Sequence, residues 1–255
     1  LSFIGTPSTR AGPGEKGPGF EVSGVHPEKK GINGFQPDEE KWKNLRKHGF
    51  TIVHLAPSEG ILRGTGPCVL LGQDNPNQLT LKEEVAQVMA FDPVGKNQSP
   101  PVYPNSLMGA LAVIRQAFLD VIHAQETTLY LKKETSPKLH LPHAGIRSLQ
   151  KVLNDKEPFP VWIEPGSCLM ENRALILSQE FGIHPVIIAT GDEWRRPDLA
   201  LSKDHSYISP LLFPALSKLP EEEDWEQISL DQLRAWDHAP GNPALISKKA
   251  KSLSL

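Results

Sequence analysis

Residues 158–196 read PFPVWIEPGSCLMENRALILSQEFGIHPVIIATGDEWRR, and this stretch decides the fold. The apolar run at 160–163 is bounded by prolines and has the length of a strand. Apolar residues at near-helical spacing follow in 169–181, and Gly182 stands where a helix C-cap glycine belongs. A second apolar run, rich in Val and Ile, occupies 184–189. Strand, helix and strand with tight connections predict a βαβ unit with parallel strands and a right-handed crossover.

Polar turns follow both strands of this unit. Residues 164–167 (EPGS) follow the first strand, and residues 190–193 (TGDE) follow the second. Parallel α/β sheets bind their ligands beyond the carboxyl ends of the strands. We therefore expect the two turns to lie at the same end of neighbouring strands and to form any site that the protein has.

The composition limits the classes of function. A net charge of −3 over 255 residues does not suggest a surface that binds nucleic acid. Two cysteines, Cys68 and Cys168, are too few for a disulfide framework or a thiolate zinc site. No apolar run is expected to span a membrane, since Arg115 and Gln116 interrupt the most apolar stretch. The chain opens on LSFIG without a basic lead-in, so no signal peptide is visible, although a targeting segment can have been trimmed.

Helical and strand-like segments alternate along most of the sequence. This alternation predicts a parallel sheet with covering helices, either closed or open. The length favours a single (β/α)₈ barrel domain over residues 1–255, incomplete at both ends. An open doubly wound sheet is the alternative, although no Gly-x-Gly-x-x-Gly turn follows a predicted strand.

Four stretches resemble the amidohydrolase superfamily in its imidazolonepropionase-like branch. They are RKHGFTIVHLAPSEGILRGTGPCVLL (46–71), YPNSLMGALAVIRQAFLDV (103–121), the stretch 158–196, and SLDQLRAWDHAPGNPALISKKAKSLSL (229–255). The resemblance implies a barrel that hydrolyses amide or cyclic C–N bonds at a centre of one or two metal ions, zinc or iron. The metal lowers the pKa of a bound water and supplies hydroxide for attack.

The metal ligands of that family do not match this sequence. No His-x-His occurs in the chain, and Glu164 stands where the first middle-strand histidine is expected. The second such position falls within 188–191 (IATG), and the last-strand aspartate would lie beyond Leu255. The resemblance thus identifies a non-canonical member, for which we predict no metal ligands at the barrel mouth and leave the cofactor unassigned.

Three carboxylates after strands are candidate site residues. We predict Glu164 and Asp192 as catalytic groups and Glu193 as a ligand-binding group, because side chains at the top of a barrel serve its site. The structural alternative for Glu164 is a carboxylate that accepts hydrogen bonds from the turn after it. For Asp192 and Glu193 the alternative is capping of a helix that starts near Trp194.

Two further ligand-binding candidates are His54 and Arg63. His54 lies late in the strand-like run 50–56 and shares a face with Ile52 and Ala56, so it is either a ligand or a satisfied core histidine. Arg63 lies in a glycine-containing loop, where it either binds an anionic group or has a solvent-facing or interdomain role.

Two functions from different classes follow. One is an amidohydrolase-type hydrolase acting on a small molecule; the other is a catalytically degenerate barrel that binds a ligand or a partner. In a closed barrel, residues 1–4 and 253–255 would be neighbouring partial strands. We therefore expect that missing residues or another chain, either a second copy or a different covering chain, cover that seam. The resemblance also implies an exported bacterial protein.

Overall fold

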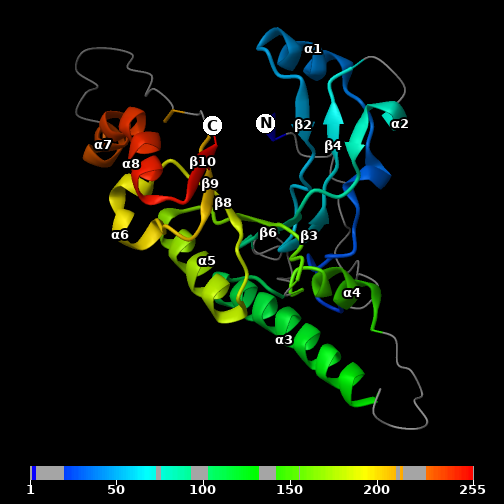
Figure 1. The fold of residues 1–255 in the computed structure, drawn as a ribbon. Helices are drawn as coiled ribbons and strands as arrows, with labels where there is room; N and C mark the ends of the chain where they lie inside the picture. Colours follow the sequence, from blue (N-terminus) through cyan, green and yellow to red (C-terminus); the bar gives the residue numbers. More distant parts are fainter. Residues whose placement is uncertain are drawn as a thin grey trace. The chain divides into compact units, whose positions relative to one another are not determined.

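A computed structural model describes residues 2–3, 20–72, 76–92, 103–131, 142–154, 156–210, 213–214 and 228–254. The chain divides into two compact units (Figure 1). Unit 1 comprises Leu1–Trp162 and Phe181–Ile183, and unit 2 comprises Ile163–Glu180 and His184–Leu255.

The first sheet of unit 1 has four strands in the order β1-β2-β4-β5. Its elements are β1 (Ser2–Phe3), α1 (Glu39–Lys47), β2 (Ile52–His54), β4 (Cys68–Leu70), α2 (Pro76–Leu79) and β5 (Thr80–Lys82). β1 pairs with β2 in parallel, and the other two pairs are antiparallel. Trp42 of α1 packs with Val53 and Val69 in a buried cluster, and its ring stacks on Phe35 at 5.7 Å. Asp38 caps α1 by accepting from the Lys41 N–H at 3.1 Å.

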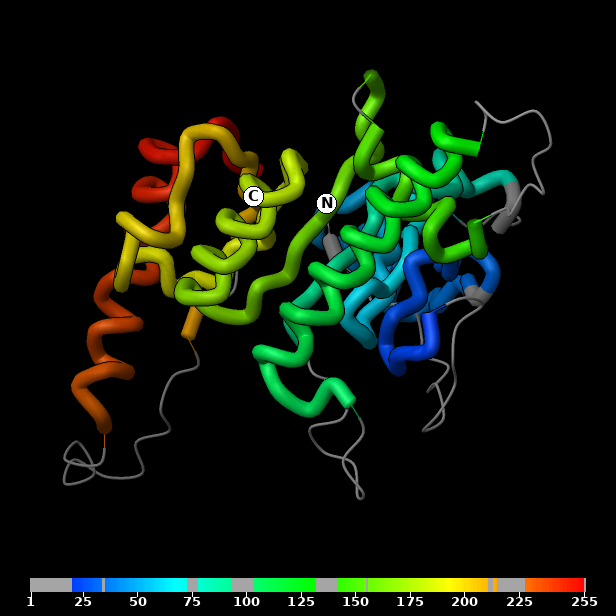
Figure 2. The backbone as a smooth tube through the Cα atoms, turned by 90° about the horizontal axis from the view of Figure 1, so that it is seen from below, coloured from blue at the N-terminus to red at the C-terminus, as the bar shows by residue number. Residues whose placement is uncertain are grey.

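The rest of unit 1 is built around an antiparallel pair and two helices. A 3₁₀ turn, η1 (Gly31–Gly34), precedes α1, and β3 (Leu62–Thr65) pairs with β6 (Gln87–Ala90). The Gln87 N–H donates to the Pro160 carbonyl at 2.8 Å, so β6 runs beside the chain that enters β7 (Val161–Glu164). α3 (Leu107–Leu131) and α4 (Ala144–Gln150) lie side by side (Figures 1 and 2).

α3 has the length and hydropathy of a membrane-spanning helix despite Arg115 and Gln116. The expectation that no segment reaches this length and apolarity was therefore wrong for α3. Six of its residues are buried, at a spacing of three or four along one face: Ala110, Val113, Ile114, Ala117, Phe118 and Val121. Phe118 packs on Phe181 with ring centroids 5.0 Å apart. This is the burial pattern of a core helix.

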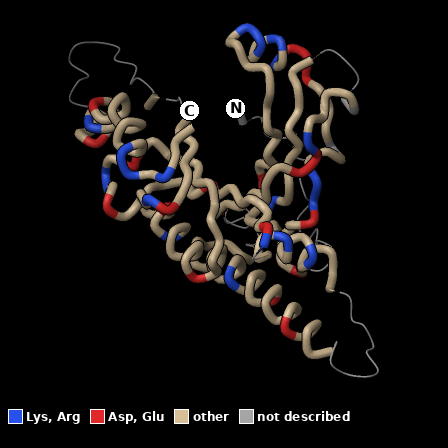
Figure 3. The backbone as a smooth tube through the Cα atoms, viewed as in Figure 1, with Lys and Arg blue, Asp and Glu red and all other residues tan. Residues whose placement is uncertain are grey.

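Unit 2 is built on parallel strands. The second half of β7 begins it, and α5 (Cys168–Phe181) leads to β8 (Val186–Ile188), the neighbour of β7 in the sheet. The remaining elements are η2 (Glu193–Arg195), α6 (Pro197–Ala200), β9 (Ser206–Ile208), α7 (Leu230–His238), η4 (Ala239–Gly241), α8 (Asn242–Lys249) and β10 (Ser252–Ser254). β8 pairs with β9 and β9 with β10, both in parallel. Figure 3 shows that charged residues gather on the helices and turns; β8, β9 and β10 carry none.

The structure confirms an α/β protein with a mostly parallel sheet and the strand–helix–strand order of 158–196. A helical crossover between neighbours is the connection that parallel strands require. The described strands form two sheets, with β1 in the first and β10 in the second, and no continuous ladder closes them into a barrel. Barrel closure, the single domain over 1–255 and the covered seam therefore remain predictions.

Candidate functional site

The turn after β8 organises the candidate site in unit 2. β8 ends at Ile188, and the Ala189 N–H still donates to the Ile208 carbonyl of β9 at 2.9 Å. The chain then turns sharply through Thr190 and Gly191, which has φ of 90°. This is a conformation that glycine adopts without strain, and it directs the chain into η2.

Glu193 lies underneath this turn and is fully buried. Its carboxylate accepts hydrogen bonds from the Thr190 N–H, the Thr190 hydroxyl at 3.0 Å and the Gly191 N–H at 3.2 Å. The Asn242 side-chain amide donates to the same carboxylate at 2.5 Å. The predicted ligand-binding carboxylate is thus engaged by its own turn, because the backbone N–H groups of a tight turn need a buried acceptor.

Glu171 of α5 joins Glu193 from the other side and is also fully buried. Its Oε1 accepts from the Thr190 N–H at 3.3 Å, so two carboxyl groups meet at one N–H. Burial, together with the hydrogen bond and the charge of Glu193, raises the pKa of Glu171 to about 11. Burial also acts to raise the pKa of Glu193, but the hydrogen bonds from Glu171, Asn242 and Thr190 outweigh it and hold that pKa below its usual range.

Asn242, the first residue of α8, connects the pair to the next element. Only 2% of it is exposed. Its Nδ2 donates to Glu193, and its Oδ1 accepts from the Trp194 N–H at 3.0 Å. One amide therefore fixes both the buried carboxylate and the start of η2 against α8.

A cavity of about 270 Å³ opens above this turn. Its polar wall includes Thr190, Asp192, Ser209 and Asn242. Its apolar wall consists of Pro210, Phe213, Pro214, Ala239, Pro240 and Pro243. Asp192 is half-buried, and its carboxylate accepts from the Arg195 Nε at 3.3 Å. The cavity lies where β8 and β9 end, which is the edge at which parallel α/β sheets bind ligands.

The structure brings together only some of the predicted site residues. Asp192 and Glu193 share the turn after β8, with Asp192 facing the cavity and Glu193 below it. Glu164 is the last residue of the neighbouring strand β7 and is half-buried. The catalytic roles predicted for Glu164 and Asp192 remain predictions.

His54 and Arg63 belong to unit 1 and are both buried. The His54 ring packs on Trp162 at 4.4 Å, and burial lowers its pKa to about 4, so it is neutral near pH 7. Arg63 donates from Nε to the Gly60 carbonyl at 2.9 Å and from Nη1 to the Pro57 carbonyl at 3.4 Å. His54 is therefore a core histidine, and Arg63 is buried and does not face solvent; the ligand-binding roles predicted for both residues remain predictions.

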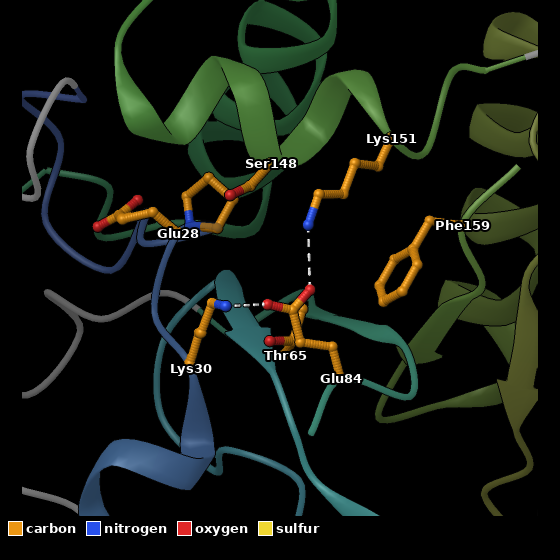
Figure 4. A pocket seen from close by; sticks show the side chains of 8 residues that line it. Glu28, Lys30, Thr65, Glu84, Ser148, Lys151 and Phe159 are labelled. Atoms are coloured by element: carbon orange, nitrogen blue, oxygen red, sulfur yellow. Dashed lines mark hydrogen bonds and ion pairs between the residues drawn. The ribbon is translucent and has the colours of Figure 1, made fainter. Parts of the chain in front are cut away.

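A second, smaller cavity of about 30 Å³ lies in unit 1 (Figure 4). Glu84 stands between two lysines there, with its carboxylate 2.5 Å from Lys30 Nζ and 3.1 Å from Lys151 Nζ. Figure 4 shows both ammonium groups directed at this one carboxylate, with Phe159 beside them. The volume suits about one water molecule, and the ionic groups satisfy one another.

The metal centre implied by the resemblance does not fit the residues of the described part of the chain. That part holds no group of three or more His, Cys, Asp and Glu side chains placed to bind a metal ion. The carboxylates after β8 already have hydrogen-bond partners. Glu193 is bound by its own turn and by Asn242, and Asp192 is bound by Arg195. A zinc or iron site needs several converging imidazole or carboxylate ligands, and the described residues do not supply such a set.

Comparison with known proteins supports the fold. No family model and no curated protein matches the chain. The structure is similar to the crystal structure of an amidohydrolase from Thermotoga maritima MSB8, with a TM-score of 0.71 and 19% sequence identity. The match covers 91% of this chain and 57% of that protein. This chain therefore has an amidohydrolase-like, barrel-related fold and spans little more than half the length of the protein it matches. Membership of the imidazolonepropionase-like branch remains a prediction.

Proposed function

We propose that this protein binds a small molecule in the cavity after β8 and β9, on an amidohydrolase-like fold, without a metal centre of the usual kind. The observation that carries the proposal is the cavity of about 270 Å³ at the carboxyl edge of the parallel strands. It combines one carboxylate, Asp192, with hydroxyl groups and a wall of prolines and Phe213. Apolar walls with a few placed polar groups are typical of small-molecule sites.

The polar groups of the cavity suggest how a ligand would be held. Asp192 can accept hydrogen bonds from N–H or O–H groups, and its side chain is still 45% exposed beside Arg195. Thr190 has its hydroxyl committed to Glu193, and Asn242 has both amide atoms committed. Asp192 is therefore the group in this wall with the most remaining capacity to bind a ligand.

A second candidate is hydrolysis of amide or cyclic C–N bonds, and the fold match favours it. Function does not follow from fold, and the donor set described above does not supply the usual metal ligands. If the protein hydrolyses a substrate without the metal-binding histidines of the amidohydrolase superfamily, Glu164 and Asp192 are the proposed catalytic residues.

Ligand-observed NMR with small amides and cyclic ureides tests both candidates on the intact protein. We expect binding that weakens about tenfold in Asp192→Asn, the loss of one charge-assisted hydrogen bond. Asp198→Asn, at an exposed aspartate paired with Arg196, is the matched control and should bind like the wild type. The same samples are then assayed for hydrolysis with added zinc, iron or manganese. Metal-dependent turnover would replace the binding proposal with the hydrolytic one.

A further inference from the structure

The pairing of Glu171 with Glu193 is the feature of unit 2 that the binding proposal leaves unexplained. Both side chains are fully buried, and both accept from the Thr190 N–H. Glu171 Oε2 is buried and has no donor among the described residues. A buried carboxylate oxygen without a donor is costly, so this geometry calls for a proton on Glu171.

Among the described residues, no cation is one of the groups that act most strongly on the pair. The groups that most strongly affect the two carboxyls are each other, Thr190, Asn242 and Cys168, and none of these is positively charged. Tyr207 of β9 is also close enough to respond to both carboxyls, and its hydroxyl donates to the Ala200 carbonyl at 2.9 Å. Asp192 and Arg195 in the adjoining turn act on Cys168, and the Arg195 guanidinium is bound by Asp231 and Asp192.

Two buried carboxylates in contact cannot both be ionised without a cation, because their repulsion and desolvation are unopposed. A single proton resolves the conflict. Placed on Glu171, it is donated to Glu193, the carboxyl with which Glu171 is hydrogen-bonded, and it leaves Glu193 ionised for its N–H donors.

We propose that Glu171 and Glu193 share one proton and act as positioning residues that hold the Thr190–Gly191–Asp192 wall of the cavity. Glu171 reaches the turn from α5, Glu193 from η2, and Asn242 ties the pair to α8. The pair has no exposed surface and therefore does not touch a ligand. The role of this wall in binding a ligand rests on the proposed function. The shared proton is independent of it.

Infrared spectroscopy of protein labelled with ¹³C-carboxyl glutamate tests the shared proton directly. At pH 8 the folded wild type should show the absorption of one protonated glutamic acid, about three pH units above the usual pKa range of the side chain. The absorption should disappear in Glu171→Gln and persist in Glu180→Gln, a control at an exposed position of the same helix. A wild-type spectrum at pH 8 without a protonated glutamic acid would overturn the shared proton, whatever the variants do.

Amide hydrogen exchange tests the positioning role. Glu171→Gln keeps a donor toward Glu193, whereas Glu171→Ala removes it. We expect the Thr190 and Gly191 amides to exchange about tenfold faster in Glu171→Ala and at the wild-type rate in Glu171→Gln. Equal exchange in all three proteins would show that the pair does not hold the turn. Neither experiment uses a ligand, so a failure here leaves the NMR binding test of the cavity unaffected.

Discussion

Each unit of this protein contains a glutamate in a different electrostatic setting. In unit 1, Glu84 lies between Lys30 and Lys151, whose side chains are 47% and 56% exposed. In unit 2, Glu193 lies with Glu171 in the fully buried interior, where hydrogen-bond donors replace cations. Burial acts to raise the pKa of Glu84, but the hydrogen bonds and charges of the two lysines outweigh it and leave that pKa below its ordinary value.

The difference shows what each arrangement is suited to do. Water and salt screen the attraction between a carboxylate and two exposed ammonium groups. Such ion pairs therefore contribute little to the free energy of unfolding. A carboxylate held by buried N–H groups and a second carboxyl is screened far less. It depends on a complete set of partners, and removal of one member leaves the others buried and unpaired. We therefore expect large effects in unit 2 and small ones at Glu84.

The largest expected effect is that of Glu193→Ala. This change leaves the Thr190 and Gly191 N–H groups and the Asn242 amide without their buried acceptor. The free energy of unfolding should fall by about 4 kcal/mol, the range for breaking a buried charged network. Urea denaturation of the variant against Glu180→Ala, at an exposed position of α5, measures this loss. A fall below about 1 kcal/mol would mean that Glu193 does not depend on its partners as described.

A smaller effect is expected in the pH dependence of stability. The folded pKa of Glu171, about 11, exceeds the ordinary value of 4.5, so the folded state binds more protons between these values. The stabilisation linked to Glu171 is complete below about pH 4.5 and is lost as pH rises, by roughly 1 kcal/mol per pH unit. Glu193 has the opposite sign: its lowered pKa adds stability that is present above its unfolded pKa and is lost as pH falls through the folded pKa.

Glu171→Gln isolates this effect, since glutamine does not titrate. Unfolding free energies measured from pH 6 to pH 9 should decline more steeply in the wild type than in the variant. The gap between the two proteins should widen by roughly 1 kcal/mol for each pH unit. Parallel curves over this range would show that Glu171 is already ionised in the folded protein.

Local sequence patterns were sufficient to predict most of the helices and strands. The acidic first turn at 37–40 and Ser229, whose side chain accepts from the Gln232 N–H, indicate two helix starts where the structure has them. By its sequence alone the run 80–91 fits either a helix or a strand, and in the structure it contains β5 and β6. Both strands pair with segments earlier in the chain, β4 and β3. Such non-local pairing decides short apolar runs that propensity leaves open.

Only part of the candidate site could be predicted from the sequence. The turn at 190–193 was predicted from its place after an apolar strand, but Glu171 was missed. A signal existed, because positions 171, 174, 175 and 178 form one buried stripe of α5, so the carboxylate sits on the core face. The pair Asn242-Pro243 indicates a helix start, but the bond from Asn242 to Glu193 joins residues 49 positions apart, which no local pattern encodes.

The smallest expected effect completes the comparison. Glu84→Gln removes one charge from between two lysines, yet the free energy of unfolding should fall by less than about 1 kcal/mol, as for exposed ion pairs. The residual amide can still accept a hydrogen bond from one lysine, and both ammonium groups can turn to water. Because exposed charges are screened by salt, the difference from the wild type should shrink further at about 1 M NaCl.

Lys30→Met combined with Lys151→Met is the matched change on the cationic side. It leaves Glu84 without its partners, but 17% of that side chain is exposed, so water can solvate the carboxylate. A loss above about 3 kcal/mol that salt does not alter, in either variant, would place Glu84 in the same class as Glu193 and remove the contrast between the two units.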